Sequence, residues 1–434
     1  MSQAIPTSQP KLTPTRKRWS GLAAREARLA AWMLAPAFII VFTIVIFPVV
    51  ANFWISFKEV QLSDLRPPQA LARARVMNFP ESAGEALSLR YQLRNSSRDV
   101  QLNDVVLTAS LPAGLTADAL AEGCTFTADT LTCTLGSWDG GYRENLELSW
   151  LASQTFIDDA SEDALSDPFV TANAPNVLTS WEFTLANFRA VVSAREFWTT
   201  LRTTLAYTLF GACGSILLGL CAAQLLNAEF PLRGLLRGLL LFPYVAPVIA
   251  VAFTWTFLLD PFSGSLNALG LELGVLGEPI SFLSQRSLSV SLLGLELTLP
   301  LALTSVILFD AWRYFPFAFL FILARFQAIP AALYESAKVD GAGPFAQFWF
   351  ITLPQLSLVI STLFLLRFIW TFNKFDDIFL LTGGTAGTRT LPVLVYDNAF
   401  GREDIGMGAA TAVILFVMLA AFLVVYFRYT PEGE

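Results

Sequence analysis

Six long apolar stretches alternate with polar segments along this chain of 434 residues. They lie at residues 29–57 and at about 199–226, 235–260, 300–324, 355–382 and 405–428. At roughly 1.5 Å per residue, a helix of about 20 residues crosses the roughly 30 Å hydrocarbon core of a bilayer. The pattern therefore predicts an all-α polytopic membrane protein with six transmembrane helices. The segment 265–299 is only semi-polar, and we expect interfacial helices there rather than a seventh span.

The polar tail at residues 1–28 carries six Lys and Arg side chains. Because positive charge stays on the cytoplasmic side of a membrane, the N-terminus is expected in the cytoplasm. The stretch 29–57 is too long for the core of a signal peptide and lacks a cleavage-type end, so we expect an uncleaved anchor. Six spans then return the C-terminus to the cytoplasm.

Residues 58–180 form a polar insert after the first span. The segment from 58 to 196 carries 19 Asp and Glu against 10 Lys and Arg, which fits the outer side of the membrane. Polar and apolar residues alternate between 86 and 153, with Gly- and Asn-containing turns between the runs. We predict an extracytoplasmic β-sandwich at about 80–152, followed by a linker at 154–180. Through NDVVLTASLPAGL and CTLG it resembles the immunoglobulin-like repeat domains of bacterial surface proteins.

Cys124 and Cys133 bracket a short hairpin in this insert. A disulfide between them is plausible in an oxidising compartment. The insert either docks a partner or serves as a solubilising spacer, and the sequence favours neither.

Ionisable residues inside the spans suggest function, because burying a charge in a membrane is costly. Counted from the ends of their helices, Asp310 and Arg367 both lie roughly 15–18 Å deep, near the middle of the bilayer. They are expected to pair across two helices, either as a structural salt bridge or as part of a ligand site. Aromatic rings suit the faces of a sugar, and carboxylates and amides suit its hydroxyls. The mixture predicts a polar, uncharged ligand held by Asp310, Trp312, Phe317, Phe372, Asn373, Asp376 and Asp377.

The mixed-polarity segment 329–354 lies between two spans. Pro330 and Pro344 each suit the first turn of a short helix, and Gly341 and Gly343 interrupt the chain between them. We predict two short helices joined by a glycine turn, whose small residues allow close approach of another protein. The alternative is an ordinary helical loop.

Several classes of function do not fit the composition. His is absent, which removes the commonest general base near neutral pH, and the four Cys have no metal-site spacing. Net charge is -7, and no basic block suits nucleic acid. We therefore expect no catalytic residue, no metal and no cofactor bound by this chain.

The segment 329–354 also carries a recognisable motif, made up of Glu335-Ser336-Ala337, Asp340-Gly341-Ala342 and the ITLP of 351–354. It resembles the EAA…DGA…ITLP signature of permease subunits of bacterial ATP-binding-cassette importers. The stretches 232–269 and 372–384 are similar to the carbohydrate branch of that family. The resemblance covers 30–57 and 181–428 and leaves the β-rich insert outside. Ser336 departs from the motif by one small-for-small change.

The resemblance implies that the motif residues dock on a cytoplasmic ATPase, which holds ATP and Mg. It also implies a sugar site between the fourth and fifth spans, at Trp312, Phe317, Phe372 and Asn373. The partners implied are a second permease subunit, two ATPase subunits, an extracytoplasmic sugar-binding protein and membrane lipid.

We therefore interpret residues 181–434 as the permease core of a multi-pass sugar importer in the bacterial inner membrane, with a maltose- or trehalose-like substrate. This chain would move sugar by alternating access and would not itself hydrolyse ATP. One rival is an ion-coupled secondary transporter with Asp310, Arg367 and Asp377 as a relay. The other is a membrane-anchored receptor or assembly protein in which the insert does the work.

Overall fold

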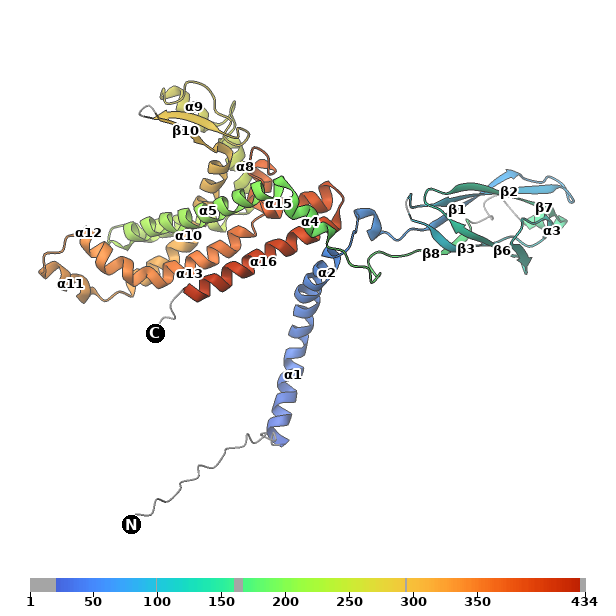
Figure 1. Ribbon diagram of the computed structural model, residues 1–434, viewed down its shortest axis with the longest axis horizontal. Coiled ribbons are helices and arrows are strands. Elements are labelled where there is room, and N and C mark those ends of the chain that lie inside the picture. The colour runs from blue at the N-terminus through green and yellow to red at the C-terminus, as the bar shows by residue number, and fades with distance from the viewer. Residues whose placement is uncertain (1–20, 99, 160–166, 293–294, 430–434) are drawn as a thin grey trace, which may run out of the picture. The chain divides into compact units, whose positions relative to one another are not determined.

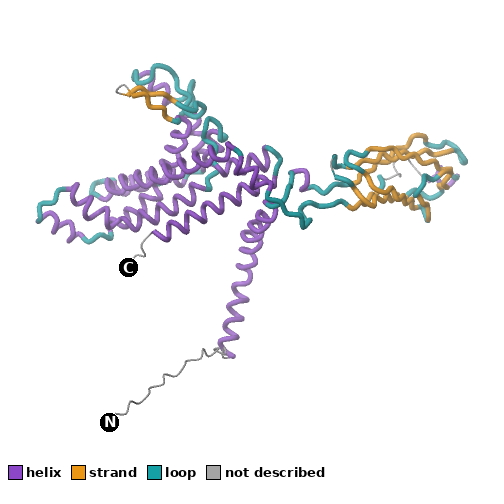
Figure 2. Tube along the Cα trace, in the orientation of Figure 1, coloured by secondary structure: helices purple, strands orange, loops and turns teal. Residues whose placement is uncertain are grey.

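The structure is a computed structural model that describes residues 21–98, 100–159, 167–292 and 295–429 (Figure 1). The chain divides into two compact units, Met1–Trp54 and Ile55–Glu434. Helices dominate both, and the strands are concentrated in the first half of the second unit (Figure 2).

The first unit is built around one apolar helix. It contains α1 (Gly21–Val41), a π-helical turn η1 (Phe42–Ile46) and most of α2 (Phe47–Ser56), whose last two residues belong to the second unit. The span from Arg25 to Ser56 is 32 residues long and apolar enough to cross a membrane. This agrees with the predicted first span at 29–57.

The polar insert contains two four-stranded antiparallel sheets. The first has the order β1-β2-β7-β4, with β1 (Ala70–Asn78), β2 (Ala86–Asn95), β7 (Arg143–Ala152) and β4 (Leu115–Ala119). The second has the order β5-β6-β3-β8, with β5 (Cys124–Thr127), β6 (Thr130–Trp138), β3 (Leu102–Ser110) and β8 (Phe169–Asn173). Alternate residues of both sheets, such as Leu89, Leu107 and Trp150, form one buried core.

The strands extend beyond the predicted range 80–152. β1 precedes that range, and β8 lies in the predicted linker 154–180, as does the short helix α3 (Gln154–Asp159). The sequence did not indicate β8 because it is a short edge strand that pairs with β3 from within a segment rich in Asp, Ser and Ala. Cys124 and Cys133 lie opposite each other on β5 and β6 and form a disulfide.

The two ends of the insert are held together by Lys58. Its side chain is buried, and its ammonium donates to the backbone oxygens of Val177, at 3.0 Å, and of Ser180. The 3-10 turn η2 (Leu62–Leu65) follows, and nearby the Gly406 N–H donates to the Val60 oxygen at 2.8 Å. These contacts join residues more than 100 positions apart.

The remaining chain is a helical bundle. Its long helices are α5 (Arg195–Asn227), α10 (Leu301–Gln327), α13 (Leu353–Phe372) and α16 (Ile405–Tyr429). In Figure 1 α5 and α10 run alongside each other, and they make extensive contact. Shorter helices connect them: α4 (Ala186–Ser193), α6 (Arg233–Leu240), α7 (Phe242–Val245), α8 (Val248–Leu258), α9 (Ser265–Glu272), α11 (Ala331–Val339), α12 (Pro344–Gln347), α14 (Asp376–Thr382) and α15 (Leu391–Tyr396).

Five helices of the described chain are long and apolar enough to cross a membrane. A sixth candidate is the pair 233–245 and 248–258, which is bent by 93°. Pro247 lies at this bend, where its ring cannot continue a helix from the preceding turn. The predicted span at 235–260 is therefore a broken helix.

Two other predicted elements differ from the structure. The segment 265–299 holds α9 and then a hairpin of β9 (Leu288–Leu292) and β10 (Leu295–Leu299), where only interfacial helices were expected. The fifth span ends at Phe372 rather than at 382. The helix ends before Asn373, and a new helix, α14, begins at Asp376. Asp376 and Asp377 occupy its first turn, where negative charge favours a helix start.

Small residues allow α5 and α10 to lie very close. Gly211, Ser215, Gly219 and Ala223 recur at every fourth position of α5, which places them on one face. A Cβ built on Gly219 would approach the Cβ of Ala318 to 2.7 Å and the backbone nitrogen of Phe319 to 2.8 Å. Such small-residue faces drive helix association in membranes, where lipid removes the usual hydrophobic gain.

Gly219→Ala is expected to destabilise the bundle, because its new methyl group meets α10 backbone that cannot move away without separating the helices. The midpoint of thermal unfolding of the purified protein in detergent should fall. Gly238→Ala in α6 is the matched control, since nothing lies within 4 Å of its Cβ position. There Ala should be neutral or stabilising, because Gly is a poor helix former. Equal unfolding midpoints for the two variants would contradict this packing.

Candidate translocation site and coupling loop

A buried ion pair joins α10 to α13 at the predicted positions. The Arg367 guanidinium donates to Asp310 Oδ2 at 2.6 Å, and the two side chains are 1% and 0% exposed. Arg367 Nε also donates to Ser215 Oγ at 3.1 Å, and the Tyr207 hydroxyl lies 3.4 Å from Asp310 Oδ1. The pair expected from the sequence is thus present, and α5 supplies two further polar partners.

The close approach of α5 makes room for this pair and then encloses it. A Cβ on Gly211 would come within 2.5 Å of Asp310 Oδ2, so only glycine fits opposite the carboxylate. Tyr207 and Ser215 were not predicted from the sequence. Their signal was present, because each lies four positions from Gly211 and therefore on the same small-residue face of α5.

Tyr314 connects this ion pair to a second group of charges. Its ring lies 4.2 Å from the Arg367 guanidinium carbon and 4.9 Å from Lys374 Nζ, and Lys374 donates to its hydroxyl. Lys374 Nζ is also 3.1 Å from Asp376 and 3.7 Å from Asp377. Asp310, Asp376 and Asp377 are thereby linked through intervening side chains.

Two buried groups beside this cluster have unused hydrogen-bonding capacity. Arg313 donates from Nη2 to the Ala246 oxygen at 3.4 Å, but its Nε and Nη1 have no partner among the described residues. Both carboxylate oxygens of Asp377, which is fully buried, also lack a hydrogen bond there. Buried polar atoms in folded proteins are nearly always satisfied, so such atoms indicate a place for water or a ligand.

The predicted aromatic ligands lie in different surroundings. Trp312 is half-buried and 5.3 Å from Trp255, and Phe317 packs 6.0 Å from Tyr244, which in turn contacts Tyr314. These rings therefore adjoin the charged cluster.

Phe372 and Asn373 are placed differently. Phe372 is 2% exposed and stacks on Phe368 at 5.8 Å, in a cluster that includes Leu415 of α16. Asn373 is exposed and donates from its amide to the Ile369 oxygen at 2.9 Å. Of the two, Asn373 is accessible and Phe372 is enclosed by protein.

The segment 329–354 projects the motif residues outward. α11 begins after Pro330, and Gly341 has a φ of +80°, a conformation that favours glycine. Ala337 and Ala342 are half-buried and joined by a 2.8 Å backbone hydrogen bond, whereas Glu335, Ser336, Asp340 and Gly341 are exposed. The Tyr334 hydroxyl lies 2.9 Å from Thr352 Oγ1, which fixes the loop to the bundle.

Only the first of the two short helices predicted here is separate. α12, the π-helical turn η4 (Phe348–Thr352) and α13 form one helix from Pro344 to Phe372, 29 residues long. Pro354 does not break it, because the π-helical turn just before it rearranges the backbone hydrogen bonds. The exposed motif is therefore followed directly in the chain by the helix that carries Arg367.

Taken together, the fold is that of a helical membrane-type protein with five or six candidate spans. A chain of a crystal structure described as a bacterial alginate ABC transporter, in complex with its alginate pentasaccharide-bound periplasmic protein, superposes with a TM-score of 0.50 and 22% identity. The match covers 58% of this chain and 85% of that one. At this identity the likeness concerns the fold alone.

Sequence comparison defines the family. The profile described as the binding-protein-dependent transport system inner membrane component matches residues 215–430. The permease protein YcjO of Escherichia coli K12 is 36% identical over 241 residues, which cover 55% of this chain and 76% of YcjO. The trehalose/maltose permease protein MalF of Thermococcus litoralis is 35% identical over 250 residues, covering 56% and 78%. The chain belongs to the family of inner membrane components of binding-protein-dependent transport systems.

Asp310→Leu alone should destabilise the protein strongly, because it leaves Arg367 buried without its counter-ion. Removing one partner of a buried pair typically costs about 3–5 kcal/mol. The double variant Asp310→Leu with Arg367→Met should recover much of the loss, as measured by thermal unfolding in detergent. Additive losses would show that the two residues do not act as a pair. If stability returns in the double variant while transport does not, the pair contributes to transport and not only to folding.

Proposed function

We propose that this chain is a permease subunit of an ATP-driven importer of a di- or oligosaccharide. Family membership, together with the exposure of the motif at residues 335–342 on the protein surface, supports this function. The relatives MalF and YcjO are named as permeases, and the name of MalF specifies trehalose and maltose. The family membership favours an importer over an ion-coupled transporter or a receptor.

The membrane topology in this proposal has six spans, with the broken helix 233–258 as the third and both termini in the cytoplasm. The segment 329–354 then faces the cytoplasm, and the two-sheet insert, which we regard as an immunoglobulin-like sandwich, lies outside. Two cytoplasmic ATPase subunits, a second permease and an extracytoplasmic sugar-binding protein complete the transporter.

The sugar site is proposed at the cluster around Tyr314. Unsatisfied Arg313 and Asp377 supply donors and acceptors for hydroxyl groups, and the Trp312 and Phe317 rings adjoin them. Asp376 and Asn373 complete the polar surface, and Asp310, which is fully buried, acts from behind it by holding Arg367. Because Phe372 is enclosed by protein, its role there is to support Phe368 and Asn373 rather than to stack on sugar.

Transport proceeds by alternating access. ATP binding closes the ATPase subunits, which move Glu335, Ser336 and Asp340 at the docking surface. Since the helix 344–372 runs unbroken from this loop, the displacement reaches Arg367 and the cavity wall. Such switching between discrete packings is a common way to convert a local event into a large motion.

Glu335→Lys is expected to abolish most sugar-stimulated ATP hydrolysis by the reconstituted complex, because it reverses a charge at the docking surface. Glu229→Lys is the matched control. It makes the same change at an exposed residue, paired with Arg233 at 3.7 Å, in the loop between the second and third spans, which the proposed six-span topology also places in the cytoplasm. Stimulation should survive there. Retained coupling in the Glu335 variant would refute the role of the loop.

Asn373→Ala and Trp312→Ala should each abolish sugar uptake while the assembled complex is still recovered. The first removes an accessible amide and the second an aromatic surface beside Trp255. Trp32→Ala is the control, because Trp32 is 78% exposed on the first helix and takes no part in the cluster. Unchanged uptake kinetics in both test variants would show that the sugar binds elsewhere.

A further inference from the structure

Two charged side chains of the helical core each keep two buried polar atoms without a hydrogen bond. Within the described chain, Arg313 on α10 leaves Nε and Nη1 without a partner, and Asp377 on α14 leaves both carboxylate oxygens. The two residues are 8% and 0% exposed. Among the other charged groups described, Arg237 and Arg389 keep one such atom each. Burying a charge without hydrogen bonds is costly, so Arg313 and Asp377 both need a partner that this packing does not supply.

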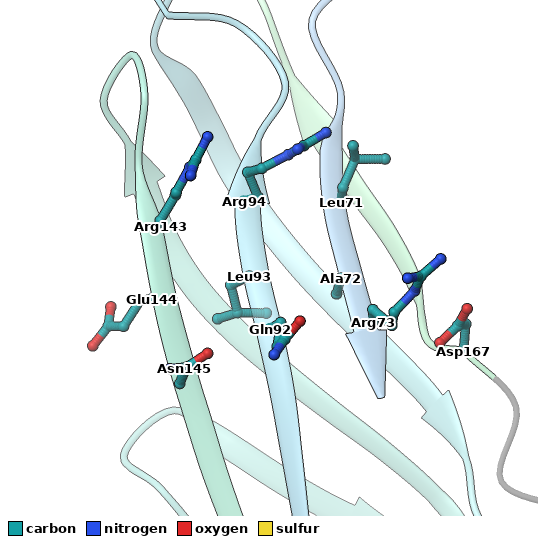
Figure 3. Close-up of a pocket in the computed structure, with 10 residues that line it drawn as sticks. All are labelled: Leu71, Ala72, Arg73, Gln92, Leu93, Arg94, Arg143, Glu144, Asn145 and Asp167. Carbon is teal, nitrogen blue, oxygen red and sulfur yellow. The ribbon is translucent and has the colours of Figure 1, made fainter. Parts of the chain in front are cut away.

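The polar hollow of the insert differs in this respect. Figure 3 shows the side chains that line it, and its volume is about 750 Å³. Its charged groups are all exposed: Arg73, Arg94, Arg143, Glu144 and Asp167. Water can satisfy exposed groups, so the unmet need for charged partners lies in the helical core.

Arg313 and Asp377 attract each other electrostatically, but no hydrogen bond or ion pair joins them in the described chain. Arg313 donates from Nη2 to the backbone oxygen of Ala246 at 3.4 Å. Lys374 Nζ lies 3.7 Å from Asp377 Oδ2, too far for a hydrogen bond, and donates to Asp376 at 3.2 Å. An arginine can donate two parallel hydrogen bonds to one carboxylate. Each of the two residues is therefore a partner of the kind that the other lacks.

Arg313 belongs to a firmly connected part of the bundle. The buried ion pair described above joins α10 to the helix 344–372 at one level. At a second level, Arg325 donates from Nε and Nη2 to the backbone and side-chain oxygens of Gln355, at 3.1 and 3.0 Å. Two polar links at separate levels hold the helices in one register. A displacement of the segment 329–354 should therefore move both helices together.

Asp377 belongs to a part of the bundle that is set apart by two helix breaks. α14 follows the helix end at Asn373, and α8 follows the 93° bend at Pro247. The two short helices pack on each other, with Val251 and Ile378 in one hydrophobic cluster. Residues at the ends of elements commonly absorb the rotation when packed helices shift. These breaks allow α8 and α14 to shift together relative to α10.

We propose that Arg313 and Asp377 form an ion pair in a second packing of the bundle, in which α14 and α8 have moved toward the middle of α10. The proposal rests on the importer function and deepens the proposed sugar site. In the first packing, the free atoms of both residues are available to the hydroxyl groups of a sugar. In the second packing the two residues satisfy each other, and the sugar loses those partners.

This pair links sugar affinity to the transport cycle. A conformational change releases a ligand only if the new state binds the ligand less tightly. In the proposed importer, ATP binding turns the cavity outward, where it receives sugar, and the nucleotide-free state releases sugar to the cytoplasm. The ion pair is therefore assigned to the nucleotide-free packing, where it replaces the hydrogen bonds of the sugar.

Cysteine cross-linking in the complete transporter tests this approach of α14 to α10. Arg313→Cys/Asp377→Cys is made in a chain whose free cysteines, Cys213 and Cys221, are replaced by Ala. The complex in lipid nanodiscs is treated with a short bifunctional thiol reagent, and the cross-linked peptides are quantified by mass spectrometry. The yield should be about tenfold higher without nucleotide than after trapping with ATP and vanadate, because the populations of the two packings shift. Equal yields, or a higher yield with ATP, would overturn the proposal.

Arg325→Cys/Gln355→Cys is the matched control pair. It joins α10 to the helix 344–372, and these two helices should keep one arrangement throughout the cycle. Its yield should be the same in both states. A parallel change in both pairs would reflect access of the reagent rather than movement of α14, and would also count against the proposal.

Neutral variants test the pair without cysteines. Asp377→Asn and Arg313→Gln each remove the attraction that stabilises the nucleotide-free packing, so ATP hydrolysis without the binding protein should rise several-fold. Asp377→Asn removes a buried charge that has no hydrogen bond, so no loss of folding is expected. The double variant should exceed neither single variant, because both changes remove the same interaction. Unchanged hydrolysis in both single variants, or rises that add in the double variant, would contradict the pair.

Stimulation of the unmodified complex separates this inference from the importer function. If the sugar-loaded binding protein does not stimulate ATP hydrolysis, the importer function itself is contradicted. If stimulation is normal while the cross-linking yields are equal in the two states, only the ion pair is overturned.

Discussion

The close contact between α5 and α10 is the constraint on which the helical core depends. Gly211 and Gly219 bring the two helices together, and the same contact encloses Asp310 and Arg367. A buried charge pair is tolerable only when its remaining hydrogen-bonding groups are satisfied. Ser215 and Tyr207 meet that requirement from α5. Packing and polar satisfaction therefore come from a single face of one helix.

This arrangement explains why charges persist in an apolar core. The ion pair links α10 to α13. Tyr314 contacts Arg367 of this pair through its ring and accepts a hydrogen bond from Lys374, which lies beyond the end of α13. The polar groups thus cross three helices and reach the exposed end near Asn373. A well-packed hydrophobic core could hold the helices equally well, so stability alone does not account for the ion pair.

Hydropathy predicted the positions of the long apolar helices well, because an apolar run of about 20 residues exceeds most buried helices of soluble proteins. It predicted poorly where a helix bends, ends or continues. Local backbone hydrogen bonds decide where a helix bends, ends or continues, and the hydropathy averaged over a stretch of residues does not report them. Examples are the bend near Pro247, the helix end at Asn373 and the continuous helix after Pro344. The charge pair was expected from depth alone, whereas Tyr207 and Ser215 were not, because their role depends on which helix lies opposite. Strand β8 was missed since its pairing with β3 is formed by residues more than 60 positions apart.

The hydrogen bonds of Lys58 bear on whether another domain could replace the insert. Because Lys58 holds Val177 and Ser180, the insert leaves and rejoins the chain at nearly one point. Domain insertion is tolerated best where the ends of the inserted segment lie close together. A compact domain whose own termini lie close together could therefore be joined to the chain at Lys58 and Ser180. This position is a natural site for replacing the insert with a reporter or with another recognition module.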